Sequence, residues 1–139
     1  RMRALGAGET INYRTTPEWD DAVLELTGGK GVDRIVEVGG PGTLQKSIKA
    51  VRVGGTIGLI GVLTGGGGSV QPVDLMRKSI TLRGIYVGPK SMFAEMNAAI
   101  SAHALKPIID STFAFEAARD AYHAMRGAGH FGKLVIDVR

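Results

Sequence analysis

The chain has 139 residues, and its balance of 44% hydrophobic to 22% charged residues is that of a globular protein and argues against disorder. The net charge of +4 comes from scattered basic residues, so we expect no nucleic-acid partner; no apolar run approaches the roughly 18 residues that a membrane span needs, so we expect no membrane partner. The absence of cysteine excludes disulfides and cysteine-ligated zinc within the chain and fits the cytoplasm, where we expect the protein.

The first half of the chain alternates short strands with helices. Helices are expected over residues 1–5, 17–26 and 43–51. Strands are expected over residues 10–13, 32–38 and 56–60. Gly6 is placed to end the first helix, Thr15 or Thr16 to cap the second, and Thr43 to cap the third. The third helix carries apolar residues on one face: Leu44, Ile48 and Val51.

The second half continues this alternation after a glycine-rich loop over residues 61–70. Helical segments are expected over residues 74–78, 91–103 and 116–125. Strands are expected over residues 81–87, 111–115 and 134–138. The helix over 91–103 is expected to turn Phe93, Met96 and Ile100 inward. The alternation predicts an α/β fold: a Rossmann-like, doubly wound, mostly parallel sheet with helices on both faces, present as a partial domain.

The stretch GAGHFGK, residues 127–133, matches two phosphate-binding patterns, the dinucleotide fingerprint and the start of a P-loop. Both patterns must follow a strand and open a helix, because the phosphate binds the amides of the helix N-terminus. Here the order is reversed, and Leu134 stands where a P-loop needs Ser or Thr. The stretch is therefore predicted to be a helix stop and turn.

A better-placed glycine turn, GGPGTLQ over residues 39–45, follows a strand and opens a helix. Gly61 ends the next strand on the same sheet edge. Two glycine-marked strand ends side by side are typical of a crevice that holds a flat ligand, although two tight turns without a ligand explain the pattern equally well.

Residues that commonly carry catalysis have no such pattern in this chain. His103, His123 and His130 lack the spacing of metal ligands, and Ser47 has no histidine partner. Glu37, one residue before the end of a strand, is expected to accept hydrogen bonds near the turn rather than to act as an acid or base. We therefore expect no catalytic residue and no metal ligand here.

Five segments in order resemble the medium-chain dehydrogenase/reductase superfamily, the zinc-type alcohol dehydrogenases and quinone oxidoreductases. They are LGAG…INYR (5–14), TGGKGVDRIVEVGGPGTL (27–44), GGTIGLIGV (54–62), LRGIYVG (82–88) and AYHAMRGAGHFGKLVI (121–136). The resemblance implies that residues 1–139 are the later part of an NAD(P)-binding Rossmann domain plus its C-terminal return strand. The first βαβ unit and the catalytic domain, with any zinc, would then be absent from this chain.

The resemblance also implies a cofactor site. The segment lining the ribose would be Val38, Gly39 and Gly40; the segment under the nicotinamide ring would be Ile60, Gly61 and Val62. The strand end holding the carboxamide would be Ile85, Tyr86 and Val87. Tyr13 resembles a tyrosine that packs near the 2′-phosphate of NADPH, and Arg14 could add charge there, which slightly favours NADP over NAD.

The expected function is therefore that of a cofactor-binding fragment of an NAD(P)-dependent oxidoreductase. The parent enzyme would transfer hydride between nicotinamide and a small-molecule alcohol, quinone or enone, and the fragment alone would be inactive. A homodimer through the edge strand 81–87 is expected. The alternatives are a class I S-adenosylmethionine-dependent methyltransferase domain, which VEVGGPGT resembles, and a non-catalytic nucleotide-binding or dimerisation module.

Overall fold

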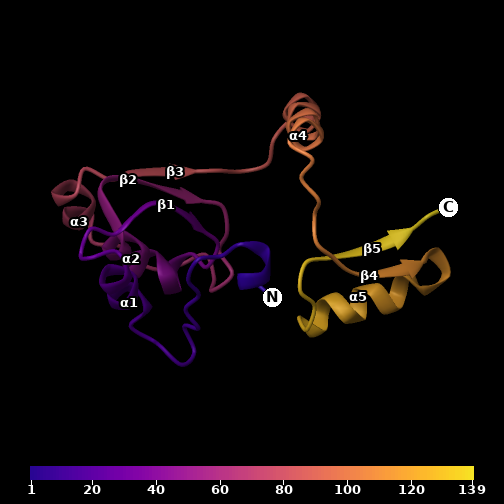
Figure 1. Ribbon diagram of the computed structural model, residues 1–139, viewed down its shortest axis with the longest axis horizontal. Helices are drawn as coiled ribbons and strands as arrows, with labels where there is room; N and C mark the ends of the chain where they lie inside the picture. Colours follow the sequence, from indigo (N-terminus) through magenta and orange to yellow (C-terminus); the bar gives the residue numbers. More distant parts are fainter. The chain divides into compact units, whose positions relative to one another are not determined.

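The computed structural model describes residues 1–139, which form two compact units, Arg1–Val87 and Gly88–Arg139 (Figure 1). The elements of the first unit are the 3-10 helix η1 (Arg3–Leu5), α1 (Trp19–Leu26), β1 (Val32–Glu37), α2 (Pro41–Ala50), β2 (Val51–Leu59), α3 (Pro72–Arg77) and β3 (Thr81–Gly84). Those of the second are α4 (Lys90–Ala102), β4 (Ile109–Ala114), the 3-10 helix η2 (Phe115–Ala117), α5 (Ala118–Gly127) and β5 (Lys133–Asp137). None of the helices is long and apolar enough to cross a membrane.

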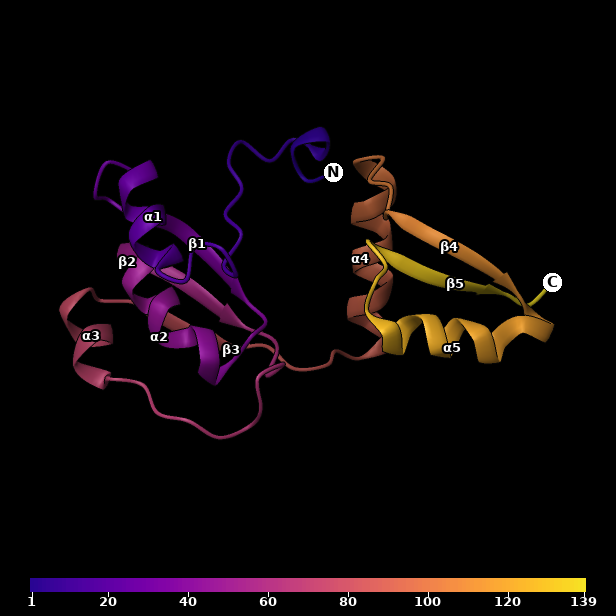
Figure 2. The ribbon, with the colours of Figure 1, turned by 90° about the horizontal axis from the view of Figure 1, so that it is seen from below.

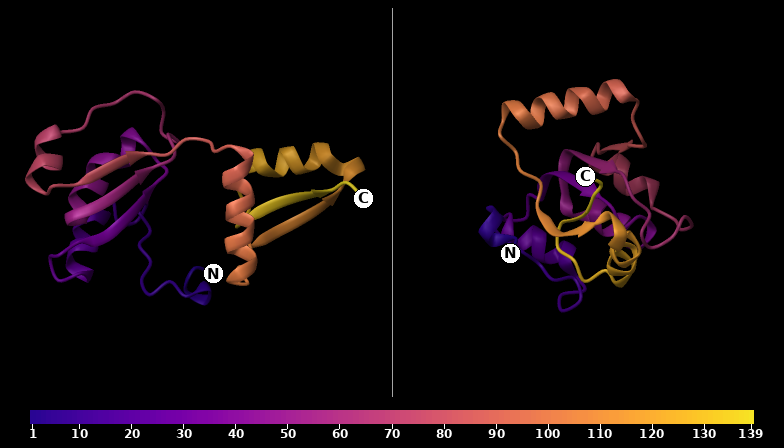
Figure 3. Two further views of the ribbon diagram at one scale, coloured as in Figure 1. Left: turned by 90° about the horizontal axis from the view of Figure 1, so that it is seen from above. Right: turned by 90° about the vertical axis from the view of Figure 1, so that its right-hand side faces the viewer.

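Each unit contains a sheet of parallel strands. In the first unit the strand order is β1-β2-β3, and Ile35, Ile57 and Leu82 stand opposite one another across it. In the second, β4 pairs in parallel with β5, and α5 lies along the pair (Figure 3). The predicted α/β class and the Rossmann-like parallel sheet flanked by helices are confirmed.

The core of the first unit lies between α2 and the sheet. Its buried apolar residues are Leu44, Ile48, Val51 and Ile57. The apolar face predicted for the third helix is thus confirmed as buried, with Leu44 and Ile48 in α2 and Val51 as the first residue of β2. Figure 2 shows α1 and α2 side by side on the same face of the strands, where α2 packs against β1 and β2.

Two glycine-containing turns take the predicted form. Gly6 ends η1 in the left-handed conformation, with a φ of 96°. At the other end of the chain α5 ends at Gly127, Ala128 adopts a φ of 51°, and β5 begins at Lys133. The stretch 127–133 is therefore a helix stop and turn, and it opens no helix that could bind a phosphate.

One predicted strand is absent, and another is shorter than predicted. Residues 10–13 form no strand, because no other strand pairs with them and their hydrogen bonds close a local turn, in which the Asn12 carbonyl accepts from the amides of Thr15 and Thr16. The strand predicted over 81–87 ends at Gly84. Its partner β2 ends at Leu59, so beyond Ile85 no neighbouring backbone remains to pair with.

The predicted threonine caps are wrong. The residue that precedes α1 is Glu18 and not Thr15 or Thr16. The Thr15 hydroxyl donates to the Asn12 carbonyl and so does not cap the helix. The residue that precedes α2 is Gly40, and Pro41 lies in the first turn. The Thr43 hydroxyl donates to the carboxylate of Glu37 instead of capping the helix.

The apolar face predicted for the helix over 91–103 is not buried. In α4, Phe93 is 59% exposed and Met96 is 50% exposed. Ile100 is half-buried, and α4 contains no buried residue, so the predicted inward face is covered only in part.

Candidate functional site

The carboxyl ends of β1, β2 and β3 meet at one edge of the first sheet. The Ile60 amide donates to the carbonyl of Glu37 at 2.9 Å, and the Leu63 amide donates to the carbonyl of Val38 at 3.3 Å. On the other side of β2, the Ile85 amide donates to the carbonyl of Leu59 at 2.9 Å. The three segments predicted to line a cofactor therefore start side by side.

Close backbone contact at this edge requires glycine at two positions. Gly40 has a φ of 78°, and a Cβ placed on it would lie 2.9 Å from Cα of Val62. A Cβ on Gly61 would collide with the carbonyl of Val38. The turn after β1 and the turn after β2 are thus in backbone contact, with no side chain between them.

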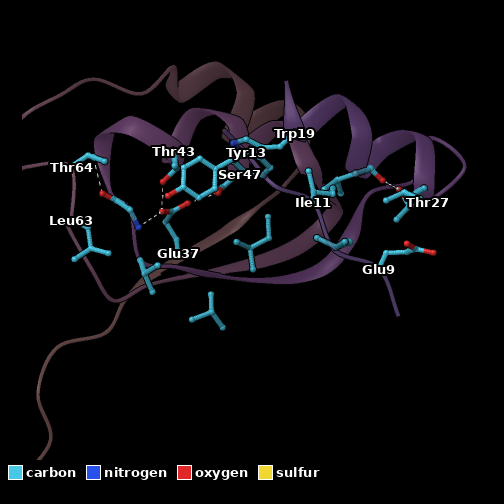
Figure 4. Close-up of a pocket in the computed structure, with 17 residues that line it drawn as sticks. Glu9, Ile11, Tyr13, Trp19, Thr27, Glu37, Thr43, Ser47, Leu63 and Thr64 are labelled. Atoms are coloured by element: carbon cyan, nitrogen blue, oxygen red, sulfur yellow. Dashed lines mark hydrogen bonds between the residues drawn. The ribbon is translucent and has the colours of Figure 1, made fainter. Parts of the chain in front are cut away.

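An open cavity of about 700 Å³ is lined by residues of β1, of the helices α1 and α2, and of the segment before α1 (Figure 4). Val38 and Gly39 line it, together with Tyr13, Trp19 and Leu63. Tyr13 therefore reaches the same cavity as the end of β1. Arg14, the next residue, is exposed in the turn that follows and does not line the cavity.

The side chain of Glu37 lies at the base of the turn after β1 and is 4% exposed. Its Oε1 accepts hydrogen bonds from the amides of Gly39, at 2.8 Å, and Gly40, at 3.0 Å, and from Oγ1 of Thr43 at 2.6 Å. Its Oε2 accepts from Oγ of Ser47. The expectation that Glu37 accepts hydrogen bonds near the turn is confirmed.

These bonds keep the carboxylate ionised. Burial by itself raises the pKa of Glu37, but the hydrogen bonds from Ser47, Thr43, Gly40 and Gly39 outweigh it and bring the pKa below its ordinary value of 4.5. The side chain is therefore an anion at neutral pH and has no proton to give as a general acid.

The amides of the glycine turn are consequently not free to bind a ligand. Gly39 and Gly40 donate to Glu37, and the amide of Gly42 donates to Oγ1 of Thr64 at 2.8 Å. The Thr64 hydroxyl in turn donates to the carbonyl of Gly39 at 2.8 Å. Sequence reasoning missed Thr64, because no local pattern connects it to a turn 22 residues or more away.

Besides Arg14, two of the predicted site residues stand apart from the rest. Tyr86 and Val87 follow the end of β3 and are 91% and 83% exposed. Ile85 remains attached to β2 through its amide. The described contacts thus bring together Val38–Gly40, residues 60–62 and Ile85, but not the two residues after it.

One acidic group, Glu18, Asp20 and Asp21, has carboxylate oxygens within 4.8 Å of one another. Lys49 lies 3.1 Å from Asp20 and 2.7 Å from Asp21, and Lys46 lies 3.0 Å from Glu18. These lysines pair with the acidic side chains and join α1 to α2, so the group is an ion-pair network between helices.

The arrangement of strand-end turns can be compared with known proteins. The family model described as zinc-binding dehydrogenase matches residues 5–136. The chain belongs to this family. The resemblance to the medium-chain dehydrogenase/reductase superfamily is thereby confirmed, and the chain corresponds to the C-terminal part of its cofactor-binding domain.

Three known proteins are similar to this chain over nearly its whole length. A zinc-type alcohol dehydrogenase-like protein of Schizosaccharomyces pombe is 35% identical over 98% of this chain and 40% of its own length. The crystal structure of an NAD-dependent alcohol dehydrogenase aligns with a TM-score of 0.84 and 32% identity, over 99% of this chain and 40% of that one. The quinone oxidoreductase of Thermus thermophilus, solved alone and with NADPH, aligns with a TM-score of 0.74 and 28% identity. The alignment covers 97% of this chain and 44% of that one.

The chain thus spans about 40% of the length of the curated relatives that it matches. The methyltransferase alternative is not favoured by these relatives. It is also not favoured by the end of β2, where the sequence Leu59–Val62 contains no acid to hold the ribose of S-adenosylmethionine.

Proposed function

We propose that the chain is the cofactor-binding part of an NAD(P)-dependent oxidoreductase that transfers hydride between nicotinamide and an alcohol, quinone or enone. The meeting of the glycine turns after β1 and β2 carries this proposal, since the carboxyl ends of parallel strands are where α/β sheets bind their ligands. Relatives named alcohol dehydrogenase and quinone oxidoreductase support it. The cofactor supplies the hydride chemistry, and this chain binds and orients the cofactor.

Within the crevice, we assign Val38–Gly40 to the ribose, residues 60–62 to the face of the nicotinamide ring, and residues 85–87 to the carboxamide. The fit is supported by Gly40 and Gly61, whose missing side chains let the turns after the two strands come into backbone contact with each other. Because the amides of Gly39 and Gly40 already have partners, this turn contacts the ribose through its surface rather than through these amides.

The remaining parts of the enzyme are assigned to the rest of the protein that contains this chain. Residues 1–139 would be the later part of the Rossmann domain with its return strand, while the first βαβ unit and the catalytic domain lie outside it. The length of the relatives supports this division. Any zinc would belong to that catalytic domain, and the 139 residues alone would turn over no substrate.

NADP is proposed over NAD as the cofactor, in a cytoplasmic enzyme. Tyr13 lines the same cavity as Val38, and Arg14 next to it is an exposed cation suited to a 2′-phosphate. The relative solved with NADPH supports this choice, whereas the NAD-dependent relative represents the other outcome.

Binding of the cofactor to the whole protein tests the proposal. NADPH and NADH are titrated against the parent and against Val38→Glu, which places a negative charge at the ribose segment on a side chain that is 46% exposed. We expect binding to weaken about tenfold or more, because the cofactor is itself anionic. The matched control is Val53→Glu, in the first half of β2, where the valine is 65% exposed.

Unchanged affinity in Val38→Glu would contradict the assigned site. A parent protein that binds neither nucleotide would contradict the proposed function as a whole. Tighter binding of NADPH than of NADH is the expected order, and the reverse order would overturn the choice of NADP. Binding without turnover by the whole protein would favour the non-catalytic module instead.

We also propose that the protein forms a homodimer through the strand predicted over 81–87. The structured part of this strand, β3, pairs with β2 on one side, and its other edge has no strand beside it in the chain. An exposed edge with free backbone groups favours pairing with a second copy.

A further inference from the structure

The turn after β1 contains an internal anion. The carboxylate of Glu37 occupies the position at the start of α2 where the amides of a helix N-terminus ordinarily bind a phosphate or another anionic ligand. Figure 4 shows its side chain pointing at Thr43 and Ser47 of α2. Glu37, the last residue of β1, thus places a negative charge at the N-terminus of α2, where the helix dipole favours an anion.

The two oxygens of this carboxylate have different partners. Oε1 holds the turn itself, through the amides of Gly39 and Gly40 and the hydroxyl of Thr43. Oε2 bonds Ser47, which lies in the second turn of α2 and is 1% exposed. One oxygen therefore shapes the turn, while the other joins the strand to the interior of the helix.

The shape of the turn extends to the neighbouring strand end. Gly39, held through its amide by Glu37, accepts from the Thr64 amide at 2.9 Å and from the Thr64 hydroxyl through its carbonyl. Gly40 packs against Val62 at a distance that no side chain would allow. A movement of the Gly39–Gly40 backbone would therefore move both sides of the crevice.

We propose that Glu37 is a positioning residue, whose buried carboxylate replaces a ligand anion at the start of α2 and holds the Val38–Gly40 turn in the form that receives the cofactor ribose. This inference rests on the proposed function. It has a corollary for the cofactor: its pyrophosphate binds away from α2, since the amides there already have an acceptor. Charge-assisted hydrogen bonds are roughly twice as strong as neutral ones, so the charge of Glu37 matters as well as its shape.

The test compares Glu37→Gln with Ser47→Ala in the whole protein. Glu37→Gln keeps the size of the side chain but removes the charge that holds the glycine amides. Ser47→Ala removes a buried hydrogen bond to the same carboxylate on the side that faces away from the glycines. The dissociation constant for NADPH is measured at a temperature where both variants are folded, and amide hydrogen exchange is measured at Gly39 and Gly40.

We expect Glu37→Gln to raise the dissociation constant about fivefold or more and to speed exchange of the two glycine amides. Ser47→Ala should stay within about twofold of the parent in affinity, whatever it costs in stability. Thr43→Val, which removes a donor to the oxygen that holds the turn, should fall between them.

Equal affinity in the parent and Glu37→Gln, with unchanged exchange of the glycine amides, would overturn the inference while leaving the proposed function in place. Equal weakening in Glu37→Gln and Ser47→Ala would also overturn it, because Glu37 would then act through general stability. A parent protein that binds no nicotinamide nucleotide would instead remove the proposed function, and the positioning role with it.

Discussion

Glu37 is a buried carboxylate whose hydrogen-bond partners include no Lys, Arg or His. Hydroxyl groups and backbone amides solvate it instead, and they hold its pKa below the ordinary value in spite of burial. Its position next to the end of a strand was visible in the sequence. Its four donors were not, because they depend on how the turn and α2 fold back over the strand.

This environment predicts an acid-dependent contribution to stability. A carboxylate whose pKa is lower in the folded than in the unfolded protein stabilises the fold fully above the unfolded pKa, and that contribution is lost as the pH falls through the folded pKa. The difference in unfolding free energy between the parent and Glu37→Gln should therefore be largest above the ordinary pKa of 4.5 and should shrink in more acidic solution.

Urea unfolding of both proteins at about pH 6 and about pH 3 measures this difference. Glu37→Gln cannot titrate at position 37, so other carboxylates affect both proteins alike. A difference that is the same at both pH values would show that the charge of Glu37 contributes nothing to stability.

The helix α2 is anchored at both ends by residues outside it. Its first turn bonds Glu37 and Thr64, and its last carbonyls, which have no partners within the helix, accept from the Lys78 ammonium. Lys78 Nζ lies 3.2 Å from the carbonyl of Ile48, 2.5 Å from that of Lys49 and 2.8 Å from that of Val51. A cation at a helix C-terminus is also favoured by the helix dipole.

Lys78→Met should therefore destabilise the first unit by about 1 to 3 kcal/mol, since it leaves these carbonyls without a charged donor while keeping the length of the side chain. Thermal or urea unfolding measures the loss. The control is Lys106→Met, at an exposed lysine between elements, which should change stability little. Equal stability of the two variants would mean that water replaces Lys78 without cost.

In the molecule as a whole, the first sheet has free edges at which another strand could pair. The sheet has the order β1-β2-β3, so β1 and β3 each have one unpaired edge within the chain. The chain spans about 40% of the length of its curated relatives. Pairing along an edge strand is a backbone interaction, so its test should remove a backbone donor and leave the side chains unchanged.

Gly84 offers that test of the proposed homodimer. The Ile85 amide points to β2, so the alternation along the strand turns the Gly84 amide outward. Gly84→Pro removes this donor from the free edge, and Gly84→Ala keeps it, in a position where an added Cβ meets no neighbour. Sedimentation of the whole protein should show a dimer for the parent and for Gly84→Ala.

For Gly84→Pro we expect the dimer to dissociate about tenfold or more readily. A monomeric parent would contradict the homodimer outright. A dimer that tolerates proline at this position would show that the copies meet through another surface.

The sequence by itself determined the α/β class, the family, the order of most elements and the nature of the turn over 127–133. These features depend on local patterns: apolar periodicity, glycines that end helices, and whether a glycine motif follows a helix or a strand. The meeting of the two glycine turns was also predictable, since Gly40 and Gly61 each follow a strand of a parallel sheet.

Only the tertiary structure decided which segments become strands and what holds the crevice together. Residues 10–13 have the composition of a strand but no partner, and β3 stops where β2 stops. The partners of Thr64 lie 22 and 25 residues away, and those of Lys78 lie 27 to 30 residues away. Such bonds cannot be predicted from local periodicity, because they form only when packing brings distant parts of the backbone within hydrogen-bond distance.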